Sequence, residues 1–428
     1  MNIILFGYGS YCIEFLNNKK SSMEIIAIAD NNSKLWGKVI NGKVIINPQD
    51  IIKYEYDYIC IISMHYKEIT KQLGLLNIKS NKIVSIYDID NQIEEFDDYY
   101  IYSNKAYDNM NRIINERPVD INIETINKCP LKCSFCCNRK IYREKQVMSD
   151  KLFEKICKDY YEIGGGSIGI SSMQSDVLSD PLLPKRIDCL NVFKDKFYIY
   201  TTTPLISLAK YSDEEVENIL NTFDYLQISV EGTNKEDYEL MSGVDAYDVF
   251  VEQIYRVKNI INTNKIDIRI DLYFRTYDIE KLKIDDTFIK LKELFPVNEI
   301  RNEFFSWFGS ISEEELPKGA KIIRKNNTYE SDNCVVPNIT LSISPDGKSV
   351  GCGCIDWESK HIIGDCNEQS LKEIWKSKKA MDFRNAFQSN NIPNICVECA
   401  LYESSKLVLS NKNLKNYKVT DGIYYNFK

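Results

Sequence analysis

Cysteines are the residues of this 428-residue chain whose number and spacing most clearly allow chemistry. Ten of the fourteen fall into two groups. The first group lies in one short loop: Cys129, Cys133, Cys136 and Cys137. The second group lies in the C-terminal quarter: Cys334, Cys352, Cys354, Cys366, Cys396 and Cys399. Cysteine thiolates are the usual ligands of iron–sulfur clusters, whereas the two histidines of the chain supply a mixed Cys/His zinc site poorly.

The spacing Cys129-x3-Cys133-x2-Cys136 allows three thiolates on one loop to hold three irons of a [4Fe–4S] cube. The fourth iron is then left open, as a catalytic metal requires and a structural metal avoids. Cys137 is interpreted as a bystander. Basic residues surround the loop and offset the negative charge of such a cluster: Lys128, Lys132, Arg139 and Lys140.

Alternating strands and helices must position this loop. Strands are expected at 120–125, 167–172, 197–202, 225–230, 265–274 and 299–307, with helices such as 150–161 and 214–223 between them. Ser212 and Glu215 form a capping box for the second of these helices. Repeated βα units predict an α/β fold with a parallel sheet. The cysteine loop follows the first strand, at the end of the sheet where βα barrels have their active sites.

The expected strands alternate between apolar and polar residues, although buried parallel strands are normally apolar on both faces. In the fifth strand Ile270 and Leu272 share one face, and Asp271 and Arg275 share the other. A filled barrel core would not tolerate so many unpaired polar groups. We therefore expect a partial (β/α)6 barrel whose polar lumen holds the substrate. The alternative is that these charges pair with one another in a structural role.

The first part of the chain predicts a separate Rossmann-like parallel-sheet domain. Gly7 and Gly9 follow an apolar strand and match the first two glycines of the dinucleotide fingerprint, while Cys12 replaces the third. Asp30 follows the second strand, where a ribose-binding carboxylate is expected. A nucleotide is therefore a candidate ligand, and the same fold without a nucleotide is the alternative. With an acidic linker at 87–100, the expected domains are 1–100, 101–325 and 326–428.

Composition narrows the class of protein. The chain is 44% hydrophobic and 27% charged, which excludes a disordered chain, and its net charge is −8. This acidic balance argues against nucleic acid as a partner. No apolar run approaches the length that spans a bilayer, and the N-terminus does not resemble a signal peptide. We expect a cytoplasmic protein without a membrane partner.

The three-cysteine loop, within roughly residues 118–402, resembles the radical S-adenosylmethionine (SAM) superfamily. The resemblance implies that Cys129, Cys133 and Cys136 bind the [4Fe–4S] cluster and that Phe135 is the aromatic residue before the last ligand. It also implies that the open iron binds SAM. Reductive cleavage of SAM, with electrons from a flavodoxin or ferredoxin, then gives a 5′-deoxyadenosyl radical that abstracts a substrate hydrogen.

Further landmarks of the superfamily are present in altered form. Gln174-Ser175-Asp176 occupies the place of the Gly-Gly-Glu segment that binds the SAM amino group. Ser229-Val-Glu-Gly232 resembles a Ser-hydrophobe-Asp-Gly motif, so Ser229 is a candidate SAM contact. Arg275 is a candidate for binding a carboxylate of SAM or of the substrate.

The C-terminal cysteines resemble a SPASM/twitch extension, a small Cys-rich iron–sulfur domain. Four of them are the implied ligands of one auxiliary [4Fe–4S] cluster: Cys334, Cys352, Cys396 and Cys399. No cysteine follows Cys399, which favours the shorter twitch form. Without the resemblance, the same four could form a zinc knuckle. Cys354 and Cys366 are left over, and Cys354 is a candidate alternative ligand or hydrogen donor.

A single closed auxiliary cluster suits the oxidation, or dehydrogenation, of a carbohydrate or nucleotide-linked small molecule. Redox-neutral epimerisation is an alternative and needs a non-ligand thiol in the cavity, for which Cys354, Cys189 and Cys137 are candidates. Maturation of a peptide substrate is a further alternative, less favoured because the chain begins with a Rossmann-like unit. A non-catalytic iron–sulfur sensor is the alternative from another class.

Overall fold

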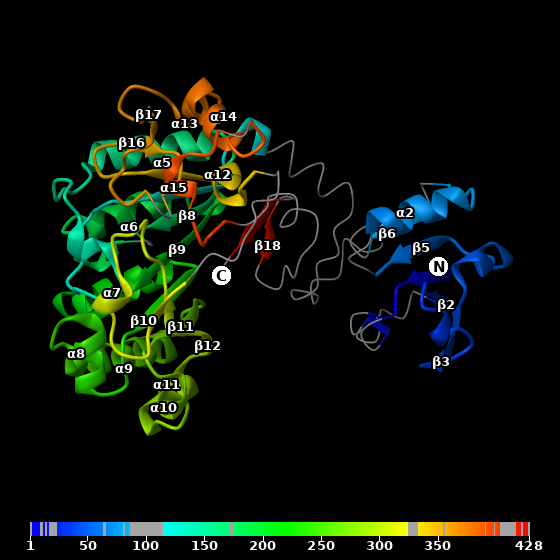
Figure 1. Ribbon diagram of the computed structural model, residues 1–428, viewed down its shortest axis with the longest axis horizontal. Coiled ribbons are helices and arrows are strands. Elements are labelled where there is room, and N and C mark those ends of the chain that lie inside the picture. Colours follow the sequence, from blue (N-terminus) through cyan, green and yellow to red (C-terminus); the bar gives the residue numbers. More distant parts are fainter. Residues whose placement is uncertain are drawn as a thin grey trace. The chain divides into compact units, whose positions relative to one another are not determined.

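The computed structural model divides the chain into two compact units, residues 1–113 with 406–428, and residues 114–405. It describes residues 2–8, 12, 15–16, 24–62, 66–79, 82–85, 114–171, 174–323, 333–353, 356–389, 391–397, 399–402, 417–420 and 423–426. Figure 1 labels the helices and strands of both units.

The first unit contains a six-stranded sheet in the order β3-β4-β2-β1-β5-β6. Its strands are β1 (Asn2–Phe6), β2 (Glu24–Ala29), β3 (Val39–Ile40), β4 (Lys43–Ile46), β5 (Tyr58–Ile61) and β6 (Ile83–Ser85). All neighbours pair in parallel except β3 and β4. The parallel strands thus follow the order 3-2-1-4-5 of the doubly wound dinucleotide-binding sheet. Helix α2 (Tyr66–Leu75) and the 3-10 helices η1 (Ser33–Leu35) and η2 (Pro48–Lys53) connect them.

Strand β1 lies in the middle of this sheet, between β2 and β5, and both of its faces are apolar. Ile3 and Leu5 pack into one core cluster, and Ile4 and Phe6 pack into another on the opposite face. This is the pattern of a parallel strand covered on both sides. Cys12 and Cys60 are fully buried in the first of these clusters, as expected for small apolar side chains.

The second unit is built on a nine-stranded sheet in the order β12-β11-β10-β9-β8-β7-β15-β16-β17. The first six are β7 (Asp120–Ile123), β8 (Gly166–Ile170), β9 (Phe197–Thr203), β10 (Tyr225–Val230), β11 (Arg269–Arg275) and β12 (Val297–Arg301). Every neighbouring pair among these six is parallel. This confirms the predicted α/β class and the run of six parallel strands.

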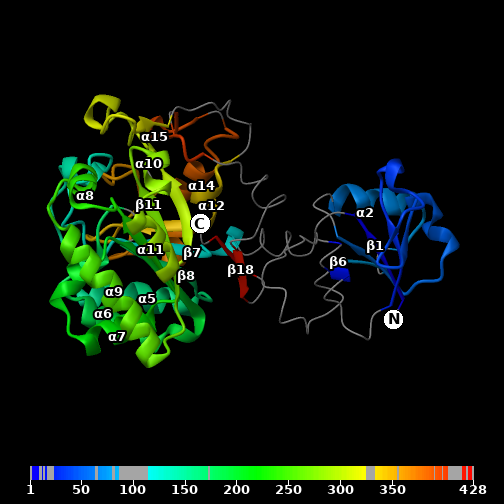
Figure 2. The same ribbon diagram turned by 90° about the horizontal axis from the view of Figure 1, so that it is seen from below.

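Helices follow the parallel strands and cover their apolar face. They are α5 (Asp150–Glu162), α6 (Leu183–Val192), α7 (Asp213–Thr222), α8 (Lys235–Ser242), α9 (Tyr247–Asn264), α10 (Ile279–Lys283) and α11 (Asp286–Leu294). Figure 2 shows α5, α6, α7 and α9 on one side of the sheet. Helix α7 begins with the predicted capping box, because Glu215 N donates to Ser212 Oγ and Ser212 N donates to Glu215 Oε2. Short 3-10 helices lie at η4 (Cys137–Lys140), η5 (Val177–Ser179), η6 (Lys194–Lys196), η7 (Ile206–Lys210) and η8 (Glu313–Glu315).

Two predicted strand boundaries were wrong. The fifth strand begins at Arg269 instead of residue 265, because Lys265 ends helix α9 in the left-handed conformation with φ of 53°. The sixth strand ends at Arg301, and the chain then forms β13 (Glu303–Phe304), which pairs with β14 (Lys321–Ile322) in a separate sheet. The first error arises because the left-handed conformation of Lys265 interrupts an alternating pattern, and the second because the chain leaves the sheet after Arg301 and pairs elsewhere.

The C-terminal segment extends the barrel sheet, although the sequence suggested a separate domain from residue 326. Strand β15 (Thr340–Ile343) pairs in parallel with β7, and β16 (Lys348–Val350) and β17 (Ile362–Asp365) continue antiparallel. Helices α12 (Val335–Ile339), α13 (Leu371–Trp375), α14 (Lys378–Arg384) and α15 (Asn394–Val397) complete this part. Strands β18 (Tyr417–Thr420) and β19 (Ile423–Asn426) form an antiparallel hairpin.

In the described part of the chain, no helix combines the length and the apolar character that a membrane crossing requires.

Candidate active site

The cysteine loop follows β7 and is held against the end of helix α8. Lys132 N donates to Ser242 O at 2.8 Å, and Ser134 N donates to Met241 O at 3.0 Å. Gly243 ends α8 with φ of 71°, and a Cβ at this position would lie 2.7 Å from Lys132 O. Glycine is therefore required here both by backbone conformation and by the close approach of the loop.

The three predicted ligands influence one another electrostatically, and Cys133 is buried whereas Cys129 and Cys136 are half-buried. Burial raises the pKa of Cys133, and Glu231, Cys136 and Cys129 raise it further. Burial, Asp176 and Cys136 likewise raise the pKa of Cys129. The thiols are thus near enough to disfavour one another's ionisation, which bound iron would reverse because it binds thiolates.

The donor set fits a [4Fe–4S] cluster. In the described residues, no three His, Cys, Asp or Glu side chains converge as ligands of a single ion do. A cube needs a different arrangement, because each cysteine binds its own iron. Cys137 is fully buried and hydrogen-bonded to Cys136, whose pKa this bond lowers. Its thiol thus supports a ligand sulfur.

Glu231 is a site residue that the sequence analysis quoted within a motif but did not select. It lies at the end of β10, is 3% exposed, and its Oε2 has no hydrogen-bond partner among the described residues. Burial raises its pKa to about 7, against the opposing effect of Arg275. Glu231 and Arg275 line a cavity with about 310 Å³ of empty space. An unpartnered buried carboxylate oxygen of this kind is suited to accept a hydrogen bond from a ligand.

Arg275 lies beside Glu231 in this cavity. Its Nη1 is 3.5 Å from Glu299 Oε2, and burial lowers its pKa while Glu231 and Glu299 oppose that shift. Ser229 lies on β10 opposite Tyr273 of β11 and is half-buried. Arg269 and Asp271 also pair, at 2.7 Å. Charged side chains of β11 therefore form ion pairs, as the structural alternative proposed. The cavity at the ends of β10 and β11 is still lined by polar residues such as Glu231 and Arg275.

In the segment 174–176, which stands in the place of Gly-Gly-Glu, the carboxylate of Asp176 forms hydrogen bonds in the protein interior. Asp176 is fully buried and accepts hydrogen bonds from Thr203 Oγ1 at 2.8 Å, Leu178 N at 3.2 Å and Ser179 Oγ at 3.3 Å. Its backbone N donates to Lys128 O at 3.1 Å. Ser175 Oγ, in contrast, is buried without a hydrogen-bond partner in the described residues. Asp176 therefore fixes the segment, and Ser175 is the side chain there that can accept a ligand.

Gln174 contacts the loops of both cysteine groups. The backbone carbonyl oxygen of Gln174 accepts a hydrogen bond from Asn138 Nδ2. The side-chain Nε2 of Gln174 donates to Gly353 O at 3.0 Å. Asn138 N in turn lies 3.5 Å from Cys136 Sγ. Because Gly353 directly follows Cys352, one glutamine joins the two predicted cluster sites.

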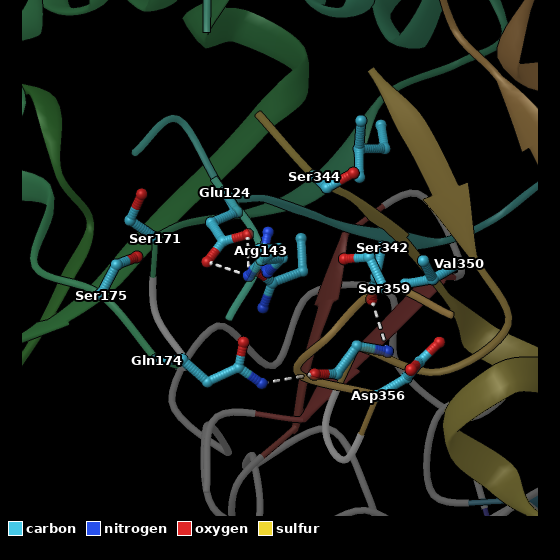
Figure 3. A pocket seen from close by; sticks show the side chains of 13 residues that line it. Glu124, Arg143, Ser171, Gln174, Ser175, Ser342, Ser344, Val350, Asp356 and Ser359 are labelled. Carbon is cyan, nitrogen blue, oxygen red and sulfur yellow. Dashed lines mark hydrogen bonds and ion pairs between the residues drawn. The ribbon is translucent and has the colours of Figure 1, made fainter. Parts of the chain in front are cut away.

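A second cavity, with about 360 Å³ of empty space, lies between these loops (Figure 3). Its lining is mostly polar: Asn122, Glu124, Arg143, Ser171, Gln174, Ser175, Ser342, Ile343, Ser344, Val350, Gly353, Asp356 and Ser359. Glu124 and Arg143 face each other with Nη2 2.7 Å from Oε2. Burial raises the pKa of Glu124 to about 6 despite the opposing effect of Arg143. The polar lumen predicted from strand alternation thus exists where β7 and β8 meet the C-terminal segment.

The sequence analysis selected neither Glu124 nor Arg143. The alternation of the first strand signals Glu124, because it continues the polar face of Asn122. No pattern signals Arg143, which reaches the site because its Nε donates to Trp357 O at 2.8 Å. Only the folded chain brings residue 143 next to residue 357.

The four C-terminal cysteines predicted as ligands lie together in one buried cluster: Cys334, Cys352, Cys396 and Cys399. Burial raises the pKa of Cys396, and Cys352, Cys399 and Cys334 raise it further. Cys354 lies outside the described residues. Cys366 is fully buried in the barrel core, 3.5 Å from Ser349 Oγ.

Cys189 does not line either cavity. It lies on α6 and is hydrogen-bonded to the buried Cys157 of α5 in the helical layer. Cys137 is likewise absent from the cavity linings. Neither described thiol is thus in place as a hydrogen donor to a substrate in the lumen.

The basic residues near the first cysteine loop divide into two kinds. Arg139 and Lys140 pair with Glu315 at 2.9 and 2.7 Å, whereas Lys128 and Lys132 are exposed. Lys145 is an additional basic residue: Cys129 and Cys136 raise its pKa, although burial lowers it overall. Its Nζ donates to Asn127 O at 2.9 Å. Positive charge near the cluster loop is therefore present, partly from a residue that the sequence did not indicate.

The predicted nucleotide site of the first unit is described only in part. Gly7 has φ of 108°, which accounts for glycine there, and Gly9 lies outside the described residues. Asp30 Oδ2 accepts a hydrogen bond from Tyr8 N at 2.6 Å, and Oδ1 accepts one from Asn32 N at 2.7 Å. A ribose would have to share a carboxylate that already holds the β1 loop. Nucleotide binding stays a prediction.

Family models and solved structures give a consistent comparison. Residues 123–273 match the model described as Radical SAM superfamily, residues 334–400 match SPASM, an iron–sulfur cluster-binding domain, and residues 1–84 match C2185-like, N-terminal. No curated protein sequence matches the chain.

Three solved structures are similar at low sequence identity. BtrN in complex with AdoMet and 2-DOIA is 13% identical, with 67% of this chain and 94% of that chain covered and a TM-score of 0.46. Streptococcus suis SuiB bound to S-adenosylmethionine is 14% identical, with 74% and 84% covered and a TM-score of 0.46. anSMEcpe with AdoMet and the Cp18Cys peptide is 14% identical, with 67% and 90% covered and a TM-score of 0.44.

The radical SAM domain binds a [4Fe–4S] cluster and SAM, and the SPASM domain binds auxiliary iron–sulfur clusters. With the matches at residues 123–273 and 334–400, the chain is a radical SAM enzyme with a SPASM auxiliary-cluster domain.

Proposed function

We propose that this enzyme oxidises an alcohol carbon of a small hydroxylated molecule, such as a carbohydrate or a nucleotide-linked sugar, and consumes SAM. One observation carries the proposal: the polar cavity lined by Gln174 and Ser175 on one side and by Gly353 on the other. This cavity adjoins both the SAM-side segment and the residue after Cys352. A substrate held there lies between the group that removes hydrogen and the group that accepts an electron.

The ligand sets follow from the two buried thiol groups. Cys129, Cys133 and Cys136 hold the SAM-binding cluster. Cys334, Cys352, Cys396 and Cys399 hold one auxiliary cluster, as in the twitch form. When bound, cluster and SAM together supply the radical that removes a hydrogen atom from the substrate.

The residues around the first cysteine loop suit the binding of SAM. Glu231 and Arg275 offer an acceptor and a cation in the cavity at the ends of β10 and β11, where SAM has hydroxyl and carboxylate groups to match. Ser175 and Gln174 line the cavity of Figure 3, and Ser229 lies on β10 two residues before Glu231. Asp176 supports this set through its internal hydrogen bonds.

Glu124 is the proposed proton acceptor. Oxidation of an alcohol carbon removes one hydrogen atom from carbon, one proton from oxygen and one electron, and leaves a carbonyl. The Glu124 carboxylate lies in the cavity, and its pKa of about 6 suits a general base near neutral pH. Arg143 orients it, and the remaining electron leaves toward the C-terminal cysteines.

The residues that line the cavity favour a small hydroxylated molecule over a peptide. The serine-rich lining offers hydroxyl donors and acceptors that match a hydroxylated substrate. Epimerisation needs a non-ligand thiol in this cavity. Of the three candidates, Cys137 and Cys189 do not line it, and Cys354 lies outside the described residues.

The test uses enzyme reconstituted anaerobically with iron and sulfide, and reduced with flavodoxin, ferredoxin or dithionite. Two [4Fe–4S] clusters predict about eight irons per chain. Candidate sugars and nucleotide sugars that carry deuterium on the alcohol carbons are then supplied with SAM. Transfer of one deuterium to 5′-deoxyadenosine with formation of a carbonyl product supports the proposal.

Other outcomes assign other functions. A product that keeps its alcohol group but carries solvent hydrogen in place of deuterium at an inverted carbon indicates an epimerase. Turnover of a peptide alone indicates a maturase. An assembled cluster that never forms 5′-deoxyadenosine, with or without substrate, contradicts catalysis and favours the sensor.

A further inference from the structure

Gln174 is the one side chain among the described residues whose hydrogen bond links the SAM-side segment to the residue next to Cys352. The side-chain Nε2 of Gln174 donates to Gly353 O at 3.0 Å, and the backbone carbonyl oxygen of Gln174 accepts from Asn138 Nδ2. Figure 3 shows the Gln174 side chain reaching across the cavity floor to this backbone oxygen. The residue is 7% exposed, so these bonds form away from water.

Both ends of this bridge are fixed. On one side, Asn138 N lies 3.5 Å from Cys136 Sγ, and Lys145 Nζ lies 3.4 Å from Asn138 Oδ1. On the other side, Gly353 N donates to Ser342 Oγ at 3.2 Å, and a Cβ at Gly353 would lie 2.3 Å from that oxygen. The bridge therefore joins two restrained loops and transmits the position of one to the other.

The residue type matters at this position. The Gly-Gly-Glu segment that Gln174-Ser175-Asp176 resembles begins with glycine, which has no side-chain donor. In this chain the carbonyl oxygen of Gly353 lies beside a proposed cluster ligand and accepts a part-buried hydrogen bond, and an acceptor shielded from water that loses its donor is costly. Gln174 supplies that donor from the segment on the other side of the cavity.

We propose that Gln174 is a positioning residue that fixes the C-terminal cluster loop relative to the first cysteine loop and so sets the separation of the two clusters across the substrate cavity. The inference rests on the ligand sets of the proposed function. Electron transfer from a substrate radical falls steeply with distance, so a fixed separation keeps oxidation faster than loss of the radical to other reactions.

The experiment compares wild-type holoenzyme with Q174L and Q174E. Leucine has a similar size and no donor, and glutamate has the same shape with an acceptor in place of the donor. In both variants we expect about eight irons per chain and unchanged binding of SAM to the first cluster. We expect amide hydrogen exchange in residues 351–361 to accelerate by about tenfold, the effect of losing one net hydrogen bond. The magnetic interaction between the two reduced clusters in electron paramagnetic resonance should change in parallel.

Q174E provides a second, pH-dependent readout. At a pH low enough to protonate the new carboxyl group, glutamate regains a donor, and the exchange rate relative to wild type should return toward that of wild type. Q174L should show no such recovery. A residue that only fills space would not distinguish the two variants by pH.

The matched control is Q146L, which makes the same chemical change where the amide donates to Glu144 Oε2 at 3.2 Å. Unchanged exchange and unchanged cluster interaction in both Gln174 variants would overturn the proposal. Loss of either cluster from both variants would also overturn it, because Gln174 would then be required for assembly. Iron near four in wild type would refute the ligand sets, and so the proposed function, instead.

Discussion

Arg143 Nη2 lies 2.7 Å from Glu124 Oε2 inside the polar cavity, and Arg143 Nε donates to Trp357 O at 2.8 Å. The two side chains are 15% and 14% exposed. A guanidinium that bonds a carboxylate and a backbone oxygen together has little freedom to turn. The pair therefore ties the end of β7 to the C-terminal segment and aims the Glu124 carboxylate into the cavity.

Glu124→Gln should separate radical formation from product formation. Glutamine keeps the shape and a contact to Arg143 but cannot take a proton. We expect formation of 5′-deoxyadenosine to continue and the carbonyl product to fall by about 10²-fold, the scale of a lost general base. Quantifying both products in one assay by mass spectrometry measures the ratio. E144Q, at an exposed position, is the control.

The pH profile provides an independent check on Glu124. Since burial raises its pKa to about 6, the proton-accepting form grows as pH rises through that value. The ratio of carbonyl product to 5′-deoxyadenosine should therefore increase from about pH 5 to about pH 7 in wild type. An equally steep increase in E124Q would assign the titration to another group.

Asp120→Asn tests the cost of a buried carboxylate at the start of β7. Asp120 accepts hydrogen bonds from Tyr200 at 3.1 Å and Thr340 at 2.8 Å, yet burial raises its pKa to about 6. Because the pKa of Asp120 is higher in the folded state than in the unfolded state, the free energy of unfolding is largest at pH values below the unfolded-state pKa. This stabilisation is lost as pH rises through about 6.

Asparagine does not ionise, so the stability of wild type relative to D120N should fall by about 3 kcal/mol between pH 3.5 and pH 7.5, as an order of magnitude. Anaerobic denaturant titrations at several pH values measure this difference. A pH-independent difference between the two proteins would show that folding does not shift the pKa of Asp120.

Cys396→Ala should remove the auxiliary cluster alone. The iron content should fall from about eight to about four per chain, because one of four thiolates is lost from a closed cluster. We expect SAM cleavage to remain and the oxidised product to disappear. C366A is the control, since Cys366 is buried in the barrel core away from the other C-terminal cysteines. Full iron content in C396A would argue that another ligand completes the site.

Gly243→Ala should displace the first cysteine loop. The new Cβ would lie 2.7 Å from Lys132 O, and φ is 71°. Gly309→Ala has a nearly identical φ of 74° but no atom within 4 Å, so it carries the backbone cost of about 1 kcal/mol without the clash. We expect G243A to bind less iron at the first site and G309A to retain it, measured by iron analysis and SAM-dependent spectra. Equal iron loss in both would attribute the effect to backbone strain.

Much of the fold could be predicted from local patterns. Ser212 and Glu215 mark the start of α7, and the alternation of Ile270 and Leu272 with Asp271 separates the packed face of β11 from its polar face. These signals are local, because capping and strand periodicity depend on neighbours in sequence. Boundaries were missed at Lys265, where a left-handed residue ends helix α9, and at Arg301, after which the chain pairs with β14 in a separate sheet.

The sequence by itself indicated the chemistry of this protein, because Cys129, Cys133 and Cys136 follow one another in a short segment whose spacing resembles that of the radical SAM superfamily. The tertiary structure decided what surrounds that chemistry. Strand β15 joins β7, which brings Gly353 to Gln174 and Trp357 to Arg143 across about 180 and 214 residues of chain. Such long-range neighbours depend on how sheet strands pair, and no short pattern in the sequence encodes that pairing.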